Sequence, residues 1–149
     1  MHSALLVTII CVAEVLTMVG TFTFPALLPT FIHEWELNNT EAGWIAGIFL
    51  GGYALSVPAL VSLTDRIDAR VVYIAGSAAS ALSLFAFAFL ADGFWSALML
   101  RMLAGIGLAA TYMPGLRMLV DRFEGVKRNR GVAFYTASFS LGTAVSFFI

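Results

Sequence analysis

Two charged side chains, Glu14 and Arg101, lie well inside long apolar segments of this sequence. If those segments cross a bilayer, each charge costs at least ~2.5–3.5 kcal/mol to insert. Charges in such places normally face the interior of a helix bundle or a water-filled cavity. Thr17 and Thr21 follow Glu14 on the same face of a helix, so the three residues predict an inward polar stripe.

Three interpretations of the two charges remain open at this stage. A carboxyl group removed from water binds a proton more readily, so Glu14 is a candidate proton-coupling site. The forked donors of Arg101 suit an anionic group of a substrate. Alternatively, Glu14 and Arg101 pair with each other, or find other partners, as a structural lock, and a tight pair would hold Glu14 ionised. Tyr112 shares a helix face with Arg101 and joins Glu14, Thr17 and Thr21 as a predicted cavity residue.

The elements that must position these residues are apolar runs. The 149 residues are 60% hydrophobic and 11% charged, whereas a soluble domain has about 25% charged residues. Mean hydropathy is +0.93. This composition predicts an all-α integral membrane protein, because an isolated segment in lipid must satisfy its own backbone hydrogen bonds. Five transmembrane helices are expected, at about 4–28, 42–63, 71–91, 94–120 and 131–149.

The distribution of basic residues predicts the orientation of these helices. Seven of the eight Lys and Arg residues lie in or beside the connections 64–70 and 117–130. The positive-inside rule places both connections, and therefore the N-terminus, in the cytoplasm of a multi-pass cell-membrane protein. Trp35, Trp44 and Trp95 fall near the predicted outer boundary, where indole rings are favoured.

Small residues predict where helices approach one another closely. Gly43, Gly47 and Gly51 lie on one helix face at four-residue spacing, and Gly105 is a further candidate in the fourth segment. The face is either a fixed packing surface or one that slides during a transport cycle. Pro114 is expected to kink the fourth segment.

The sequence offers no pattern typical of catalysis or of cofactor binding. It contains no His/Cys metal spacing, no phosphate-binding glycine loop and no nucleophile–base arrangement, and Cys11 is the single cysteine. We therefore expect no enzyme activity, no cofactor, no metal site and no nucleic-acid partner.

A short charged hinge between the second and third segments carries a resemblance to a known family. Residues 61–70 read VSLTDRIDAR and are similar to the Gly-x-Leu-Ala-Asp-Arg-x-Gly-Arg-Arg/Lys motif of the major facilitator superfamily. Leu63, Asp65, Arg66 and Arg70 match that motif. Val61 and Asp68 replace its glycines, and Ala69 replaces a basic residue.

Other segments resemble the same family in order along the chain. They are Gly20 with Pro25 and Pro29, 41–44 with 51–55, Arg101 with Gly105 and Gly107, and the basic turn 128–131. Gly142 is followed by Thr143 rather than by proline, which departs from the antiporter-type pattern.

The resemblance implies twelve helices in two six-helix halves, with substrate bound between the halves. The chain would then be five helices of an incomplete six-helix N-terminal half, and its partners would be the lipid bilayer, a small-molecule substrate and the missing C-terminal half. The resemblance also implies that the first and fourth helices line the cavity and that Asp65, Arg66 and Arg70 form a gating motif. By that analogy, Arg66 and Arg70 are predicted to pair with Asp121 or Glu124.

The predicted function is transmembrane secondary transport of a small solute by alternating access, with proton coupling through Glu14 as a hypothesis. Five helices have no second half to rock against, so a longer protein is expected. The alternative is a non-transporting membrane assembly or sensor protein that acts through helix packing. A membrane-embedded enzyme ranks third, because no catalytic constellation is visible.

Overall fold

The computed structural model describes residues 3–148, and none of these lies in a strand. The helices are α1 (Ser3–Met18), α2 (Thr23–Ala26), α3 (Leu28–Glu34), α4 (Asn39–Thr64), α5 (Ala69–Leu90), α6 (Phe94–Val120) and α7 (Gly125–Ser146). Three of them, α4, α5 and α6, are long and apolar enough to cross a membrane, and α1 is a shorter apolar helix. The chain is therefore an all-α, multi-pass membrane protein, with large apolar side chains such as Leu55 and Phe89 exposed on its outside.

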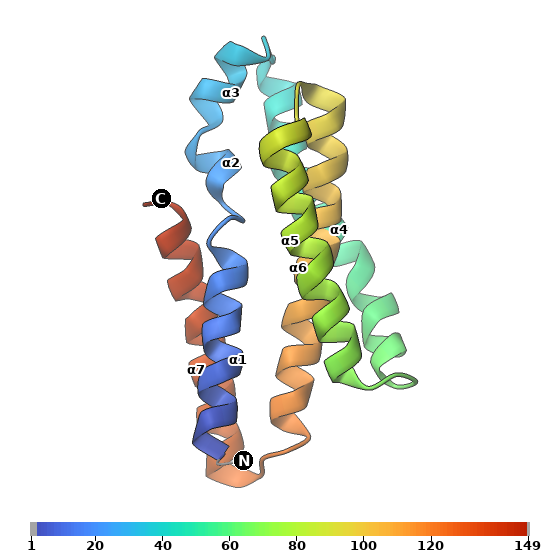
Figure 1. Cartoon of the computed structure of the whole chain (residues 1–149), viewed down its shortest axis with the longest axis vertical. Coiled ribbons are helices and arrows are strands. Elements are labelled where there is room, and N and C mark those ends of the chain that lie inside the picture. The colour runs from blue at the N-terminus through green and yellow to red at the C-terminus, as the bar shows by residue number, and fades with distance from the viewer. Residues whose placement is uncertain (1–2, 149) are drawn as a thin grey trace.

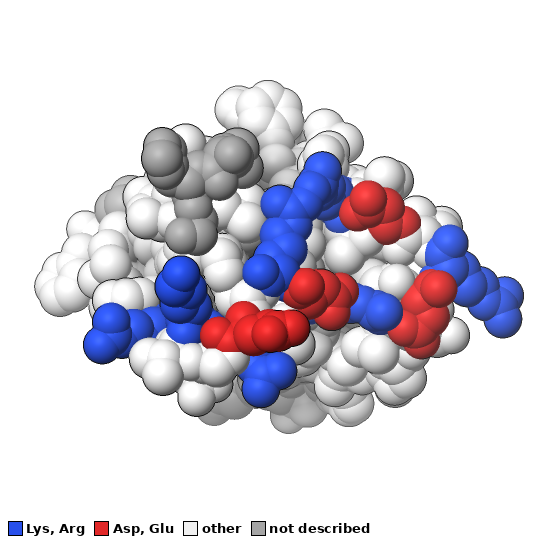
Figure 2. Space-filling view, turned by 90° about the horizontal axis from the view of Figure 1, so that it is seen from below, with Lys and Arg blue, Asp and Glu red and all other residues white. Residues whose placement is uncertain are grey.

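The long helices run side by side in two groups (Figure 1). α6 packs against both α4 and α5, while α1 packs mainly against α7. The connections 64–70 and 117–130 meet at one end of the bundle, which we call the basic end. Figure 2 shows Lys and Arg side chains interspersed with Asp and Glu on this end. Trp35, Trp44 and Trp95 lie at or near one end each of α3, α4 and α6. Figure 1 shows α3 at the end of the molecule away from the basic end.

Local hydrogen bonds determine where α4 and α5 begin. Asn38 and Glu41 form a capping box at the start of α4, in which each side chain accepts the other residue's backbone N–H at 2.9 Å. Asp68 caps α5 by accepting the backbone N–H of Arg70 at 2.8 Å. Asp68 thus has a structural role at the hinge position where the family motif has a glycine.

Glycines bring α6 close to its two long neighbours. A Cβ atom at Gly52 of α4 would lie 2.5 Å from the Met102 carbonyl oxygen, and one at Gly105 would overlap the Phe49 carbonyl oxygen. On the α5 side, a Cβ atom at Gly76 would lie 2.5 Å from the Ala110 Cβ. Only residues without a side chain allow backbones to approach this closely.

The predicted glycine face of α4 is not where this packing occurs. Nothing lies within 4 Å of a Cβ atom built at Gly43 or Gly47, and one built at Gly51 meets only Ile48 of its own helix. Gly52, one position further along, is the residue that faces α6. No helix of the described chain covers the Gly43, Gly47 and Gly51 face, so close packing on it stays a prediction.

The first apolar segment differs most from its predicted form. Instead of one helix over 4–28, α1 ends at Met18, and α2 and α3 continue the path to Glu34. Pro25 and Pro29 supply no backbone N–H and crowd the carbonyl four residues earlier, so a continuous helix is disfavoured here. The last segment also differs, since α7 begins at Gly125 and its predicted end at Ile149 lies outside the described residues.

Candidate transport site in the helical core

The interruption after α1 leaves backbone groups that other helices satisfy. Pro25 has no N–H to donate to the Thr21 carbonyl, as a continuous helix would require. Arg101 of α6 takes that place, and its Nη1 donates to the Thr21 oxygen at 2.6 Å. The Phe22 N–H donates to Ser146 Oγ of α7 at 2.9 Å. Side chains from α6 and α7 therefore hold the interrupted segment.

Arg101 is buried, and no residue of the described range 3–148 serves as its counter-ion. Its side chain is 2% exposed, and its guanidinium carbon lies 4.6 Å from the centre of the Phe49 ring and 5.6 Å from that of Phe24. These distances allow cation–π attraction. Its Nε has no hydrogen-bond partner among the described residues. The guanidinium thus retains both an unbalanced charge and an unused donor.

Glu14 is fully buried and is held by a tyrosine. Its Oε2 accepts a hydrogen bond from the Tyr135 hydroxyl at 2.9 Å, whereas Oε1 has no partner within residues 3–148. The Tyr135 oxygen also lies 3.4 Å from the carbonyl oxygens of Thr111 and Tyr112 on α6. Three helices therefore meet at this hydroxyl.

The two buried charges do not pair with each other, which was one form of the predicted structural lock, but each has another partner, which was its other form. In the described part of the chain, ion pairs involve only Arg117 with Asp65 and Asp121. Glu14 and Arg101 instead use separate partners, because the turns of α1 and α6 that carry them face different neighbours. Neither charge neutralises the other.

The remaining predicted cavity residues have different environments. The hydroxyls of Thr17 and Thr21 donate to carbonyls of their own segment, at 2.8 Å and 3.2 Å. The half-buried Tyr112 stacks on Tyr135 with ring centres 5.4 Å apart. Thr17 thus adds no polar bridge between helices, whereas Thr21 contributes its backbone carbonyl.

Sequence analysis missed two residues that complete this core, Tyr135 and Ser146. Both lie in the last apolar segment and were not selected as site residues. A phenol or hydroxyl in an apolar helix requires a hydrogen-bond partner, and that requirement is the signal that could have selected them. The partner itself lies in another helix, so local spacing could not identify it.

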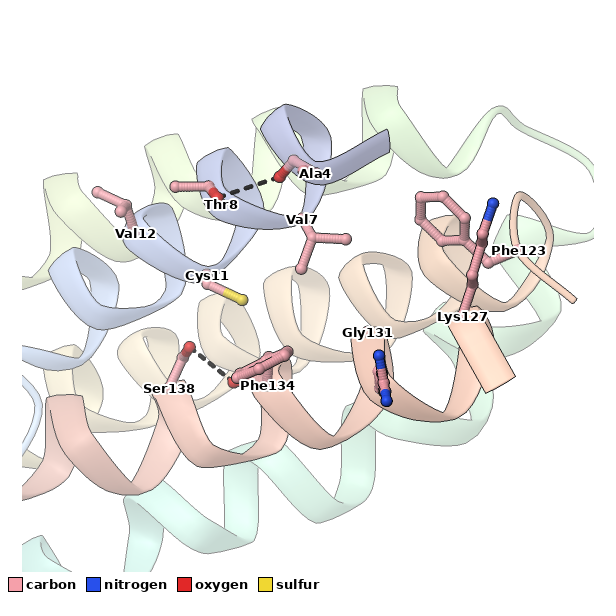
Figure 3. Close-up of a pocket in the computed structure, with 11 residues that line it drawn as sticks. Ala4, Val7, Thr8, Cys11, Val12, Phe123, Lys127, Gly131, Phe134 and Ser138 are labelled. Atoms are coloured by element: carbon pink, nitrogen blue, oxygen red, sulfur yellow. Dashed lines mark hydrogen bonds between the residues drawn. The ribbon is translucent and has the colours of Figure 1, made fainter. Parts of the chain in front are cut away.

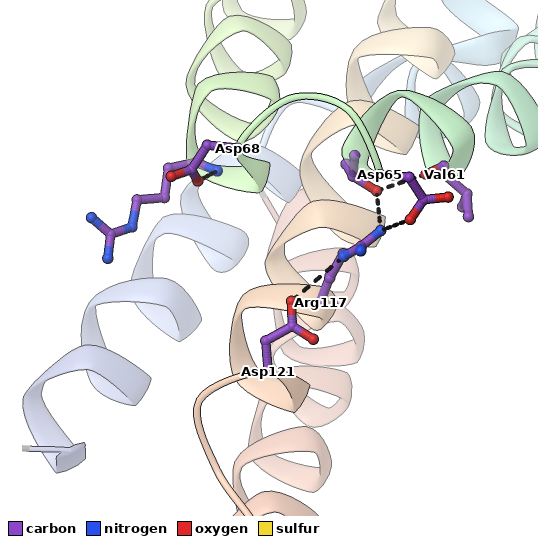
Figure 4. Close-up of polar contacts among 7 residues, drawn as sticks. Val61, Asp65, Asp68, Arg117 and Asp121 are labelled. Atoms are coloured by element: carbon purple, nitrogen blue, oxygen red, sulfur yellow. Dashed lines mark hydrogen bonds and ion pairs between the residues drawn. The ribbon is translucent and has the colours of Figure 1, made fainter.

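Ion pairs at the basic end differ from the predicted ones (Figure 4). Arg117 of α6 donates to Asp65 Oδ1 at 2.6 Å and to Thr64 Oγ1 at 2.9 Å, and its Nε lies 3.5 Å from Asp121 Oδ2. Arg66 and Arg70 are exposed and form no ion pair with Asp121 or Glu124 in the structure's described range. Arg117 replaces them because it lies one turn before Asp121 and faces the end of α4.

An open groove of about 490 Å³ lies between α1 and α7, which are packed together, on the outside of the bundle (Figure 3). Its walls are mainly apolar and include Val7, Cys11 and Phe134, while Lys127 and Arg130 lie at its basic end. The groove belongs to the exposed surface, whereas Glu14 and Arg101 are enclosed.

Fold and core together define a helical multi-pass membrane protein whose interior holds two charges that form no ion pair among the residues described. The family model of the Major Facilitator Superfamily matches residues 10–149, and the chain belongs to this superfamily. It is 24% identical over 147 residues to protein spinster homolog 1 of Bos taurus and of Homo sapiens, which covers 98% of this chain and 28% of each relative. It is also 25% identical over 120 residues to the niacin transporter NiaP of Acinetobacter baylyi, which covers 80% of this chain and 27% of that protein.

The chain therefore spans less than a third of the length of these relatives. Membership of the superfamily assigns the chain to a family of membrane transporters.

Proposed function

We propose that this chain is part of a secondary transporter that moves a small solute by alternating access. The observation that carries the proposal is the separation of the two buried charges, Glu14 and Arg101, each with unused hydrogen-bonding capacity. A purely structural pair would neutralise both groups, because an unpaired buried charge is costly. Separate, unpaired charges suit two separate ligands, a proton and an anion.

Arg101 is the proposed contact for an anionic group of the solute. It lies beside an interrupted helix, and discontinuous helices form the substrate sites of many transporters. A carboxylate or phosphate would supply the missing negative charge and accept the unused Nε–H. The carboxylate of niacin makes that compound a suitable first probe, given the similarity to the niacin transporter of Acinetobacter baylyi.

Glu14 is the proposed proton site. Its carboxyl group is fully buried and receives a single hydrogen bond, from Tyr135. Because no basic side chain balances it in the described chain, protonation would remove an uncompensated charge from the membrane interior.

The surroundings of this site complete the proposal. We place the basic end on the cytoplasmic side of the cell membrane, in accordance with the positive-inside rule. Asp65, Arg66 and Arg70 are proposed to act in gating, with a C-terminal half of the same polypeptide as the rocking partner. The exposed apolar surface suits contact with lipid.

Uptake by reconstituted vesicles tests the proposal. The complete polypeptide that carries this chain is inserted into liposomes, and labelled niacin is supplied with and without a pH gradient. We expect the gradient to accelerate uptake, the Glu14→Gln variant to lose this acceleration, and the exposed Glu34→Gln control to retain it. Equal acceleration in the Glu14→Gln variant would contradict the proton role.

The same vesicles test the anion role of Arg101. Neutral nicotinamide serves as the matched solute, since it has the ring of niacin without the carboxylate. We expect preference for the anion in the unmodified protein and loss of that preference in Arg101→Gln. If Arg101→Gln still distinguishes the two compounds, Arg101 is not the anion contact.

A further inference from the structure

The Tyr135 hydroxyl has more acceptors within reach than it can serve. Glu14 Oε2 lies at 2.9 Å, and the carbonyl oxygens of Thr111 and Tyr112 lie at 3.4 Å. A phenol carries one proton, so it donates to one of these oxygens at a time. The Tyr135 hydroxyl therefore donates its hydrogen either to the carboxyl group of Glu14 on α1 or to a backbone carbonyl of α6.

The position of this hydroxyl is tightly constrained. Tyr135 is fully buried, and its hydroxyl lies where a Cβ atom at Gly115 would be. The Tyr112 ring stacks on its other side. The hydroxyl hydrogen can therefore rotate between acceptors while the ring stays in place.

The protonation state of Glu14 determines which acceptor is used. An ionised Glu14 only accepts, so Tyr135 donates to it, as in the structure. A protonated Glu14 must itself donate, and its Oε1 has no hydrogen-bond partner in residues 3–148, whereas Oε2 already has one. The Tyr135 oxygen, next to Oε2, is the available acceptor. Its own hydrogen then has to turn toward the Thr111 or Tyr112 carbonyl.

We propose that Tyr135 is a positioning residue that converts protonation of Glu14 into a new hydrogen bond on α6. This inference rests on the proposed proton role of Glu14. The link between α1 and α7 persists in both states with donor and acceptor exchanged, whereas the bond from α7 to α6 forms only when Glu14 is protonated.

The new bond would act on the turn of α6 that precedes a proline, where a helix bends readily. Thr111 and Tyr112 lie in the turn before Pro114, and proline removes one helical hydrogen bond from that turn and crowds the Ala110 carbonyl. Helices bend most readily at such places. A bond to this turn therefore gives α7 a way to change the bend of the helix that carries Arg101.

The other ionisable groups around Glu14 do not compete for this role. Tyr73 from α5, Tyr53 from α4, Tyr112 from α6 and Cys11 from α1 are nearby. None of them donates a hydrogen bond to Glu14 in the described structure, where Tyr135 is its only donor.

Infrared difference spectroscopy of the reconstituted complete protein, recorded as the pH is lowered, tests the exchange without any solute. We expect a carboxyl C=O band that is absent in Glu14→Gln, and a tyrosine ring band that changes over the same pH range. In Tyr135→Phe the tyrosine change should vanish, while the Glu14 band persists at the frequency of a carboxyl group without a hydrogen-bonded partner. The matched Tyr112→Phe variant should keep both bands.

The outcomes separate this inference from the proposed function. A Glu14 band without a Tyr135 signal overturns the exchange and leaves the proton site in place. A tyrosine signal that survives in Tyr135→Phe also overturns the exchange. If no Glu14 band appears, the proton role itself is wrong and the exchange falls with it. A residue that only filled space would produce no tyrosine signal coupled to Glu14.

Discussion

α6 is joined to its two sets of neighbours by different means. On one side, glycines at positions 52, 76, 105 and 107 set its distance from α4 and α5 at the level of the backbone. On the other side, buried charged and phenolic groups, namely Arg101, Glu14 and Tyr135, connect it with the interrupted first segment and with α7. The first junction depends on shape and the second on hydrogen bonds.

This difference shows how one helix can be both fixed and responsive. Backbone packing, supplemented between α5 and α6 by a hydrogen bond from the uncharged Ser83 hydroxyl to the Leu100 carbonyl at 2.6 Å, involves no titratable group in the core of the bundle, so we expect α4, α5 and α6 to stay together when protons or solutes bind. Hydrogen bonds to titratable or charged groups change when a ligand arrives. If the two junctions differ in this way, added volume should disrupt the first, whereas loss of a hydrogen bond should disrupt the second.

The α4–α6 junction should be intolerant of added volume. Gly105→Ala places a Cβ atom on the Phe49 carbonyl oxygen, so the two backbones must separate. We expect a loss of about 1–3 kcal/mol in the free energy of unfolding, which is typical of overpacking. Titration with a denaturing detergent in mixed micelles measures it.

The control for this prediction is Gly93→Ala in the loop before α6. Nothing lies within 4 Å of a Cβ atom there, and the backbone φ of 166° is extended and open to any residue. Its expected effect stays within about 0.5 kcal/mol. Equal losses in the two variants would show that backbone contact does not fix this junction.

At the responsive junction, the Ser146 hydroxyl should help Arg101 to hold the helix interruption. Ser146→Ala removes the acceptor of the Phe22 N–H and should cost about 1 kcal/mol, the net value of an ordinary hydrogen bond. Exchange of the Phe22 amide hydrogen should also accelerate. Ser138→Ala is the matched control, because that hydroxyl bonds only to the Phe134 carbonyl of its own helix. Unchanged exchange at Phe22 in Ser146→Ala would remove this support for the interruption.

The ion pair at the basic end should contribute less than either junction. The side chains of Arg117 and Asp65 are 36% and 62% exposed, and solvent screens exposed pairs so that they contribute little to stability. A double-mutant cycle with Arg117→Gln and Asp65→Asn should give a small favourable coupling that declines as salt is added. A cycle of Arg70→Gln with Asp121→Asn should give none. Coupling between Arg70 and Asp121 instead would favour the pairing predicted by analogy with the family.

The contrast between the junctions also explains what the sequence could predict. Apolar length and charge distribution determine that helices form near 39–64, 69–90 and 94–120 and that Glu14 and Arg101 lie between the ends. Each of these inferences uses neighbours along the chain. The interruption after Met18 was missed because the apolar composition continues through it, although Pro25 and Pro29 were visible.

Partners across helices were beyond prediction for a physical reason. Which residue of α7 meets Glu14 depends on the rotation and axial shift of two helices that are far apart in sequence. A change of one residue in that alignment would bring Phe134, which cannot donate a hydrogen bond, into the place of Tyr135. In the same way, the alignment of α4 with α6 decides that Gly52 rather than Gly51 makes the contact between these two helices.

The smallest expected effect on stability belongs to the most deeply buried cation. Replacing Arg101 with methionine removes a charge-assisted hydrogen bond to the Thr21 carbonyl, worth about 1.5–3 kcal/mol. The same change also removes a charge whose insertion costs about 2.5–3.5 kcal/mol. The two terms oppose each other and nearly cancel, so the free energy of unfolding of Arg101→Met should change little, although preference for an anionic solute should be lost. A large loss of stability would instead mean that Arg101 serves mainly to hold the interrupted helix, which would make the responsive junction as structural as the rigid one.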